Sequence, residues 1–375
     1  MIKDSVAVLD IGTSKVTAII GENGVNGNFI IRSISEVPCT AFFDDQFVDE
    51  TALRSAISQA IVSVCKTASV LLTEITVSVP SAFLKTVNRE YEKSYPRRKR
   101  LRAKEVRQYY DEAWENFGLN FSDFEPIGRR GMFFNLDGNR RVEKILGEKT
   151  MTIRGYISYF FAKSDFVKVV GGVLRTLGIN TVNYVPSALA EALLLFSSEE
   201  RFSFRILLDV GYLTSEVSII YGGALLYTTA FPIGGGVITA RLCEEMRVDI
   251  ELAERLKRRL NLSVPVDSEG TYELNWGEEI FTFAQKKCND CARAVLSSLI
   301  ESVDKAIIDS RVKLPRDAVI YLTGGGISFM RGAKEFVFNG IEMPVTIIEP
   351  KLVYMSKPNE TSKLAILNFA LNEKD

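Results

Sequence analysis

The chain has 375 residues, of which 46% are hydrophobic, and its 46 basic and 47 acidic residues leave a net charge of −1. This length exceeds one ordinary hydrophobic core and predicts two domains, while the balanced charge argues against general nucleic-acid binding, which needs an excess of Lys and Arg. The sequence contains no His, which excludes His-based catalytic triads, His general bases and His metal ligands.

The N-terminal segment predicts a strand, a tight turn and a return strand over residues 6–21. An apolar run leads to Asp10, Gly12 permits a tight turn, and β-branched residues follow. An Asp at such a turn is either a turn former or a metal ligand. No basic and apolar leader precedes the strand, so we expect no secretion signal.

The next segment predicts the rest of a first sheet. A strand is expected at residues 29–37, and Asp49 can cap a helix whose apolar residues recur at helical spacing. A short strand at residues 75–79 ends at Pro80. The pattern therefore indicates a three-stranded sheet, a helix and a further strand.

Residues 81–149 have a different pattern and predict a separate insert of strand, helix, strand and strand. A strand-like segment at residues 83–91 leads into a basic run at residues 97–104, and an amphipathic helix follows that Gly118 ends. The basic run is best explained as a solvated turn. A docking site for an acidic partner, an anionic-lipid patch and a nucleic-acid patch are the other interpretations. Beyond the insert, a helix, a short strand and a second helix are expected at residues 165–177, 181–185 and 187–196.

The N-terminal hairpin pattern returns at residues 206–220. An apolar run leads to Asp209, Gly211 and Thr214, and β-branched residues follow. We interpret the two hairpins as one supersecondary unit used twice, with the later turn two residues longer. Facing each other, they would form opposite sides of a cleft. Glycine would admit a phosphate there, turn N–H groups would bind its oxygens, and each Asp would hold a hydrated Mg²⁺.

The C-terminal part predicts mainly helices. Glu254 and Lys257 share one helix face, and the simplest interpretation is an ordinary surface ion pair. The expected elements are helices at residues 238–246 and 249–260, an irregular segment at 261–276, a long helix at 278–310, a strand at 345–348 and a helix at 360–371.

A glycine triplet, Gly324, Gly325 and Gly326, follows an apolar strand that begins at Val319. Such a turn lets a flat or anionic group lie on bare backbone. A glycine triplet alone is weak evidence, because loops use glycine freely. Two Asp hairpins followed by this turn, in this order, are much stronger evidence.

Five scattered cysteines predict reduced thiols in a cytoplasm. Cys288 and Cys291 form a CxxC pair within a predicted helix, and without a second pair it fits helix packing better than a metal site. No apolar run approaches the roughly 20 residues that a membrane span requires.

Three motifs of this chain are similar to those of the actin, Hsp70 and sugar-kinase superfamily. They are a first phosphate motif from Asp10 to Lys15, a second phosphate motif from Asp209 to Glu216 and an adenosine motif from Thr323 to Gly326.

Within the superfamily, the order of parts resembles the bacterial cell-division family FtsA over nearly the whole chain. The insert lies after residues 75–79 and before Tyr156, where FtsA proteins have their subdomain 1C. The run from Tyr156 to Ala190, which includes Pro186-Ser-Ala-Leu-Ala, and the segment Tyr221-Gly-Gly-Ala-Leu are similar to FtsA. The segment Ala253-Glu254-Arg-Leu-Lys257 looks like the family's Ala-Glu-x-x-Lys, whose Glu and Lys contact the nucleoside.

The resemblance implies an α/β fold of the actin-like (ribonuclease H-like) type, with two domains, mixed sheets flanked by helices and an FtsA-type 1C insert. The implied subdomains are 1A at residues 1–80 and 156–200, the 1C-like insert at 81–155, 2A at 201–236 and 311–375, and 2B at 237–310.

The resemblance also implies ATP and Mg²⁺ as cofactors. Asp10 and Asp209 would position hydrated Mg²⁺ and would be the catalytic groups. The residues expected to bind the nucleotide are Gly12, Thr13, Ser14, Lys15, Gly211 and Thr214 at the phosphates, Glu254 and Lys257 at the ribose or base, and Gly324, Gly325 and Gly326 at the adenosine.

The chain departs from the family pattern at two places. Tyr212 and Leu213 stand where the family's second phosphate turn has further glycines, and their side chains would crowd the γ-phosphate. Val185 stands where many actin-like ATPases have a Glu that orients the attacking water. Because phosphoryl transfer depends on positioning and charge stabilisation, we expect weak or no hydrolysis, at most that of a slow ATPase.

The implied function is nucleotide-dependent assembly and docking of cell-division partners. The expected partner is the tubulin-like protein FtsZ, and self-association into filaments is expected as well. Binding to nucleic acid is not expected. FtsA normally ends in a basic amphipathic helix that lies in the membrane, whereas the tail at residues 369–375 is short and mixed in charge. We therefore expect a cytoplasmic protein that reaches the division site or the inner face of the membrane through a partner.

Two alternatives remain open at this stage. A small-molecule kinase of the same superfamily needs a catalytic carboxylate in the first domain, and no loop offers an obvious one. A nucleotide-independent pseudo-actin scaffold would follow if the turn at Tyr212 and Leu213 closed the pocket.

Overall fold

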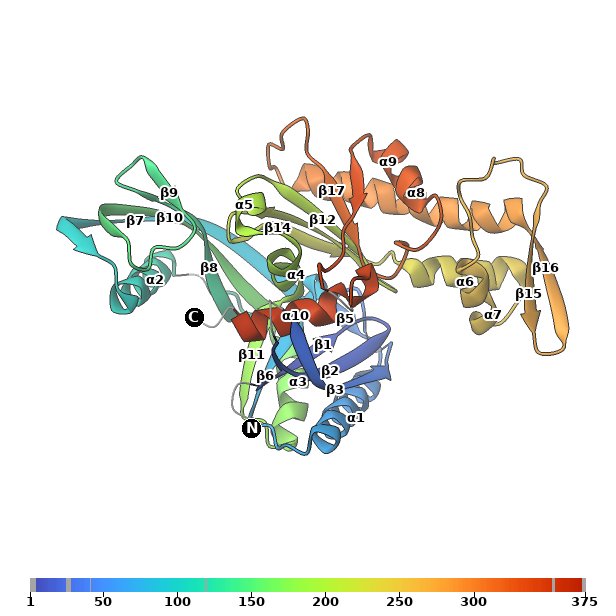
Figure 1. Ribbon diagram of the computed structural model, residues 1–375, viewed down its shortest axis with the longest axis horizontal. Coiled ribbons are helices and arrows are strands. Elements are labelled where there is room, and N and C mark those ends of the chain that lie inside the picture. Colours follow the sequence, from blue (N-terminus) through green and yellow to red (C-terminus); the bar gives the residue numbers. More distant parts are fainter. Residues whose placement is uncertain (1–4, 25–27, 41, 119, 353–354, 373–375) are drawn as a thin grey trace.

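The computed structural model describes the chain except residues 1–4, 25–27, 41, 119, 353–354 and 373–375, so the last residues of the predicted tail lie outside the described part. Three sheets and two short β-ribbons build an elongated molecule (Figure 1). Among the described residues, no helix has the length and the apolar character needed to cross a membrane.

The first sheet has the strand order β11-β6-β1-β2-β3. Alternate side chains of its strands face two different helix layers. Leu9 packs with α1 and α3 on one face, and Val8 packs with α4 and α10 on the other. The predicted cap is confirmed, because the Asp49 side chain accepts a hydrogen bond from the N–H of Ala52. The elements are β1 (Ser5–Ile11), β2 (Lys15–Asn23), β3 (Phe29–Pro38), β4 (Phe42–Phe43), β5 (Gln46–Phe47), α1 (Glu50–Ala68), β6 (Glu74–Val79), α3 (Ser164–Thr176), β11 (Thr181–Pro186), α4 (Ser187–Leu195) and α10 (Thr361–Asn372).

The insert forms a second sheet, of order β7-β10-β8-β9, with one helix packed against it. Its elements are the 3-10 turn η2 (Ser81–Phe83), β7 (Leu84–Arg100), α2 (Ala103–Phe117), β8 (Phe124–Leu136), β9 (Arg140–Val142) and β10 (Lys149–Lys163). In Figure 1 it projects from one end of the molecule.

The first insert strand is longer than predicted. The sequence indicated a strand that ends near Tyr91, whereas β7 pairs with β10 as far as Arg100 opposite Lys149. Pro96 lies within β7, and this position is tolerated because β7 is an edge strand, where a missing N–H disrupts no second ladder. The basic run therefore continues a strand and enters a helix, rather than forming a turn alone.

The third sheet has the order β14-β13-β12-β17-β18 and packs against the C-terminal helices. Its elements and neighbours are α5 (Ser198–Arg201), β12 (Arg205–Val210), β13 (Ser215–Tyr221), β14 (Ala224–Phe231), α6 (Gly235–Met246), α7 (Ile250–Lys257), α8 (Gln285–Asp309), β17 (Ile320–Thr323), α9 (Ala333–Ile341), β18 (Val345–Ile347) and the 3-10 turn η3 (Pro358–Glu360).

The two Asp hairpins have turns of equal length, so the predicted difference of two residues is wrong. Asp10 pairs with Thr17 across its hairpin, and Asp209 pairs with Glu216, each seven residues later. Each turn closes through one backbone hydrogen bond, from Gly12 to Lys15 and from Gly211 to Thr214. Polar residues at the start of the second return strand concealed this equivalence in the sequence.

The segment before the long helix was also predicted incorrectly. Instead of an irregular stretch and a helix from residue 278, the chain forms a hairpin of β15 (Thr271–Trp276) and β16 (Glu279–Ala284), and α8 begins at Gln285. Gly277, with φ of 63°, makes the tight turn between the strands. Cys288 and Cys291 are buried in the core that α8 helps to form, as the packing interpretation expected.

The C-terminal helix α10 crosses the middle of the molecule (Figure 1) and packs against β1 and α4. Residues 311–375 therefore contribute to the core of the first sheet as well as to the third sheet. The four-subdomain division stays a prediction.

Candidate functional site

The two hairpins and the glycine triplet surround one cavity of about 480 Å³. Asp10 is the last residue but one of β1 in the first sheet, and Asp209 is the last but one of β12 in the third. The structure brings together all the predicted site residues, since each of them lines this cavity: Asp10, Gly12, Thr13, Ser14, Lys15, Asp209, Gly211, Thr214, Glu254, Lys257, Gly324, Gly325 and Gly326. Their individual roles remain predictions.

Asp10 is held by hydroxyl groups from two distant segments. The hydroxyls of Ser78 and Ser362 donate to its Oδ1 at 2.9 and 2.8 Å, and the Ser78 hydroxyl also accepts from the N–H of Ile11. Burial raises the pKa of Asp10, and these hydrogen bonds oppose that rise only in part. The carboxylate is therefore fixed in direction before any ligand arrives.

Three further carboxylates converge beside it, and sequence analysis did not assign two of them, Glu191 and Glu216. Oxygens of Glu191, Asp209 and Glu216 all lie within 4.8 Å of one another. Burial, then the charges of Glu216 and Asp10, raise the pKa of Asp209 to about 7. Burial, then the neighbouring Asp209, raise the pKa of Glu191 well above its ordinary value.

Glu191 lies on α4, which is otherwise almost wholly apolar, and this isolated charge was the signal that sequence analysis missed. Its side chain is buried, and neither oxygen accepts a hydrogen bond from an N–H or O–H group of the described residues. Val185, where a catalytic Glu was sought, is buried among apolar side chains and does not line the cavity. A carboxylate thus enters the cavity from α4, six residues after that position.

These residues fit a divalent cation. A buried carboxylate without a hydrogen-bond donor is costly unless a positive charge compensates it, and both oxygens of Glu191 and one of Asp209 are in that state among the described residues. Oxygen ligands of this kind suit Mg²⁺. Asp10, Glu191, Asp209 and Glu216 are the groups that would hold it, directly or through water.

The two sides of the cavity touch each other through their turns. The N–H of Leu213 donates to the Thr13 hydroxyl at 3.0 Å, and the N–H of Ser81 donates to Glu216 at 3.3 Å. The Tyr212 side chain lines the cavity near Gly236 and Lys257, whereas Leu213 is not among the lining residues. Of the two bulky residues, only Tyr212 narrows the cavity with its side chain.

Glu254 and Lys257 form a partly buried ion pair rather than a surface pair, since the Lys257 side chain is 8% exposed and that of Glu254 is 27% exposed. Lys257 Nζ lies 2.6 Å from Glu254 Oε2 and also donates to the carbonyl of Gly235. Burial would raise the pKa of Glu254, but its hydrogen bond with Lys257 lowers it. Burial lowers the pKa of Lys257 in spite of this partner. Such an arrangement can present fixed polar groups to a ligand that enters beside them.

Lys15, a predicted phosphate ligand, is engaged with another partner. Its Nζ lies 2.7 Å from Glu36, which also pairs with Lys363 at 2.8 Å. Burial would lower the pKa of Lys363, but hydrogen bonds with Glu36 and Glu360 raise it. A phosphate would have to draw Lys15 from Glu36, and Lys363 would remain to balance that carboxylate.

Replacement of Gly324 by Ala is expected to lower the free energy of unfolding by about 2 kcal/mol or more. Gly324 has φ of 87°, and a Cβ there would lie 2.0 Å from Asp209 Oδ1. The matched control is Gly325→Ala, whose Cβ would meet only Asn359 at 3.0 Å. Chemical denaturation would measure both. Equal stability of the two variants would contradict the close approach of the triplet to Asp209.

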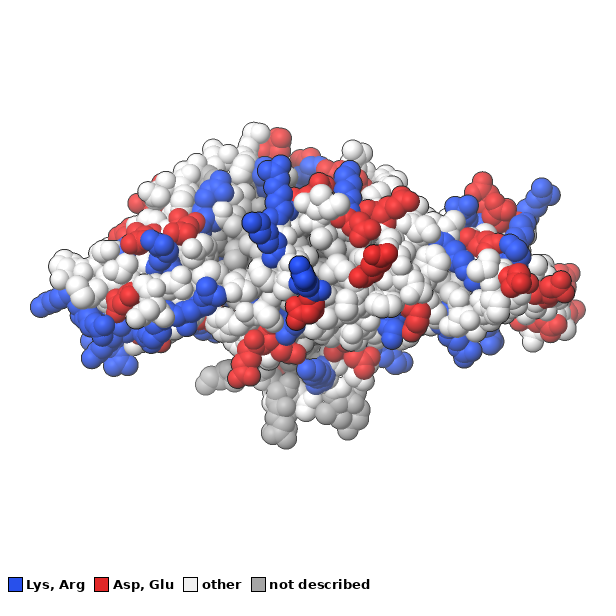
Figure 2. All heavy atoms as spheres, turned by 90° about the horizontal axis from the view of Figure 1, so that it is seen from above, with Lys and Arg blue, Asp and Glu red and all other residues white. Residues whose placement is uncertain are grey.

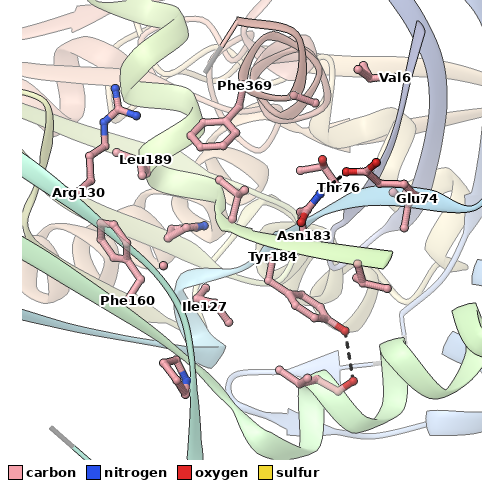
Figure 3. A pocket seen from close by; sticks show the side chains of 18 of the residues that line it. Val6, Glu74, Thr76, Ile127, Arg130, Phe160, Asn183, Tyr184, Leu189 and Phe369 are labelled. Carbon is pink, nitrogen blue, oxygen red and sulfur yellow. Dashed lines mark hydrogen bonds between the residues drawn. The ribbon is translucent and has the colours of Figure 1, made fainter. Parts of the chain in front are cut away.

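A larger cavity, of about 790 Å³, lies between the first sheet and the insert. Figure 3 shows Ile127 and Phe160 of the insert facing Tyr184 of β11 and Leu189 of α4. The Tyr184 hydroxyl donates to the carbonyl of Val167 at 3.3 Å. None of the predicted site residues lines this cavity.

In sequence, the chain is similar to FtsA cell-division proteins. A family model described as "Cell division protein FtsA" matches residues 206–365. FtsA of Neisseria meningitidis serogroup B is 22% identical over 355 residues, which cover 92% of this chain and 84% of that protein. FtsA of Pseudomonas aeruginosa is 21% identical over 350 residues, which cover 91% of this chain and 82% of that protein.

Solved structures show the same fold. The PilM-PilN type IV pilus biogenesis complex contains a chain that matches with a TM-score of 0.62 and 16% identity, covering 98% of both chains. MreB5 of Spiroplasma citri bound to ADP matches with a TM-score of 0.57 and 14% identity, covering 98% of this chain and 96% of that one. The predicted actin-like fold is confirmed, and in sequence the chain is similar to FtsA cell-division proteins over more than 90% of its length.

Proposed function

We propose that this FtsA-like protein binds ATP with Mg²⁺ between its two Asp hairpins and uses the bound nucleotide to control assembly and the docking of cell-division partners. The observation that supports this most strongly is the convergence of Asp10, Asp209 and the glycine triplet on one cavity. A similar fold in MreB5 of Spiroplasma citri was solved with ADP and with AMPPNP.

Each group of the cavity has a definite task in this proposal. The turns after Asp10 and Asp209 present backbone to the phosphates, and the bare backbone of the triplet accepts the adenosine. Glu254 and Lys257, already fixed by each other, meet the ribose or base. The cation would neutralise phosphate charge and relieve the repulsion among the carboxylates.

Nucleotide hydrolysis is proposed to be slow at most. The N–H of Leu213, which would face the phosphates, is already bonded to Thr13, and Tyr212 narrows the cavity. In this proposal Glu191 is the carboxylate that would orient a water molecule, but burial and the neighbouring Asp209 raise its pKa and so favour the neutral form, which is a weaker base. The cavity is thus better suited to hold a nucleotide than to turn it over.

Closure of the cavity around the nucleotide would change the surfaces that partner proteins bind. The contact from Leu213 to Thr13 joins the turns of the first and third sheets, and the contact from Ser81, just after β6, to Glu216 lies beside it. A ligand between the turns would therefore change how the sheets approach each other. A ligand that binds one arrangement better shifts the population toward it. We propose a cytoplasmic protein that acts at the division site, with FtsZ as a partner.

A nucleotide titration tests the binding part of the proposal. The melting temperature of the full chain is measured with ATP, ADP or GTP, each with and without Mg²⁺. A ligand that binds only the native state at 100 times its Kd stabilises it by about 2.7 kcal/mol. We expect a rise with ATP that depends on Mg²⁺, together with little phosphate release. If no nucleotide raises the melting temperature, the scaffold alternative is correct.

The docking part is tested at the cavity of Figure 3. β11 pairs only with β6, and residues 124–131 of β8 pair only with β10 among the described strands, so two strand edges are open beside this cavity. Open edges accept an extended peptide. Leu189→Arg, which places a charge in the cavity, is expected to weaken co-sedimentation with division partners at least tenfold, while Leu71→Arg on the exposed surface should not. Equal binding by both variants would exclude this cavity as the docking place.

A further inference from the structure

The far end of the insert carries a concentration of positive charge. Figure 2 shows blue side chains gathered there with few red ones, in contrast to the mixed colours at the other end. The sequence from Arg97 to Lys104 supplies six basic residues and no acidic one. A protein with a net charge of −1 therefore has one strongly basic face.

Two separate segments build this face. The loop before β10 is fastened to the end of β7, since the N–H of Leu101 donates to the carbonyl of Glu148 at 2.8 Å and the N–H of Gly147 donates to that of Leu101 at 2.7 Å. Lys149 then pairs with Arg100 in the sheet. Basic residues of the loop and of the β7–α2 connection thus lie beside each other on a rigid sheet end.

The acidic residues nearby already form ion pairs with other basic residues. Glu105 pairs with Lys99, Asp137 with Arg98, and Glu148 with Arg140. Six exposed basic residues of this end form no ion pair with any described residue: Arg97, Arg100, Arg102, Lys104, Lys144 and Lys149. Their charge is available to an anionic partner.

Apolar side chains stand among these cations. Leu146 is 63% exposed and Met151 is 43% exposed. Met151 lies at an irregularity of β10, where its N–H donates to Asp137, and this fixes its position at the sheet end. Exposed apolar side chains within a basic cluster are typical of surfaces that enter a lipid interface, whereas contacts with the phosphates of a nucleic acid or with an acidic peptide need the cations alone.

We propose that the far end of the insert binds an anionic phospholipid membrane directly, with its six unpaired cations facing the headgroups and with Leu146 and Met151 entering the interface. The projecting position of the insert (Figure 1) allows this contact without covering the nucleotide cavity. The charges act over about one Debye length, roughly 8–10 Å. The local cluster of cations, and not the net charge of the chain, therefore sets the attraction to the membrane. The inference is independent of nucleotide binding.

The test is sedimentation of the full chain with vesicles of phosphatidylcholine alone or of an equimolar mixture with phosphatidylglycerol. We expect binding only to the mixed vesicles, weakening as salt rises. Each cation removed should lower partitioning about fivefold, so the triple variant Arg97→Ala, Arg100→Ala, Lys104→Ala should lose about a hundredfold. The matched control removes three exposed cations outside the insert that form no ion pair with a described residue, Lys305, Lys313 and Arg316, and should bind like the parent chain.

A further variant separates lipid from other anions. Leu146→Ser keeps every charge and should lower vesicle binding about tenfold, while leaving any weak binding to duplex DNA or polyglutamate unchanged. Equal binding to both vesicle types, or equal losses in the triple variant and its control, would overturn the proposal. Binding of the chain to DNA or polyglutamate without any binding to vesicles would also overturn it. Unchanged melting temperatures of the variants would show that folding is intact.

Discussion

The Asp10→Ala variant is expected to show no rise in melting temperature when ATP and Mg²⁺ are added, although the parent chain does. Two hydroxyl groups, those of Ser78 and Ser362, hold the Asp10 carboxylate in place. Without it, the cation loses its ligand on the first-sheet side and the two sides are no longer joined. The expected loss is the whole ligand stabilisation, about 2.7 kcal/mol at 100 times the Kd.

The comparison must be made within each variant, with and without ligand. Removal of the Asp10 carboxylate also leaves Ser78 and Ser362 without an acceptor, which changes the stability of the ligand-free chain. Asp267→Ala, the same chemical change on an exposed loop, is the control and should keep the full rise. A rise that persists in Asp10→Ala would place the nucleotide elsewhere.

The second large effect is expected from Glu191→Gln in the metal-free protein. Burial and the neighbouring carboxylates raise the pKa of both Glu191 and Asp209, that of Asp209 to about 7. The folded state then binds more protons than the unfolded state between about pH 4 and pH 7. The free energy of unfolding therefore falls as the pH rises through this range. Glutamine stays neutral at every pH, so the folded variant pays neither for keeping the Glu191 proton nor for burying its charge, and it should be more stable than the parent chain at pH 7.5 by roughly 2 kcal/mol.

Denaturation with urea at several pH values measures this effect. Glu191→Gln should flatten the decline between pH 4 and 7, and Glu244→Gln, an exposed control, should leave it unchanged. Mg²⁺ should stabilise the parent chain at neutral pH more than the Glu191→Gln variant, because the cation can displace the Glu191 proton and pair with the carboxylate, whereas glutamine cannot ionise. A parent chain whose stability does not depend on pH in this range would mean that the carboxylates are solvated.

Local patterns were sufficient for much of the fold. The run to Asp10, the run to Asp209 and the strand before Gly324 predicted three strand ends, and the structure places all three around one cavity. Each of these signals depends on a few neighbouring residues, since strand, tight turn and glycine conformation are set by short-range sterics. The β15–β16 hairpin was missed although Tyr272 and Leu274 alternate with polar residues, because a helical pattern follows directly.

What the sequence alone determined, then, was the set of hairpins and turns and the cavity they would share. Only the tertiary structure showed that Glu191 belongs to it, because α4 must dock against the first sheet before its single carboxylate meets Asp209. The ion pair between Lys15 and Glu36 and the backbone hydrogen bond between Leu101 and Glu148 likewise join segments that are apart in sequence. Such convergence depends on how helices and sheets pack, and residue spacing along the chain carries no record of that packing.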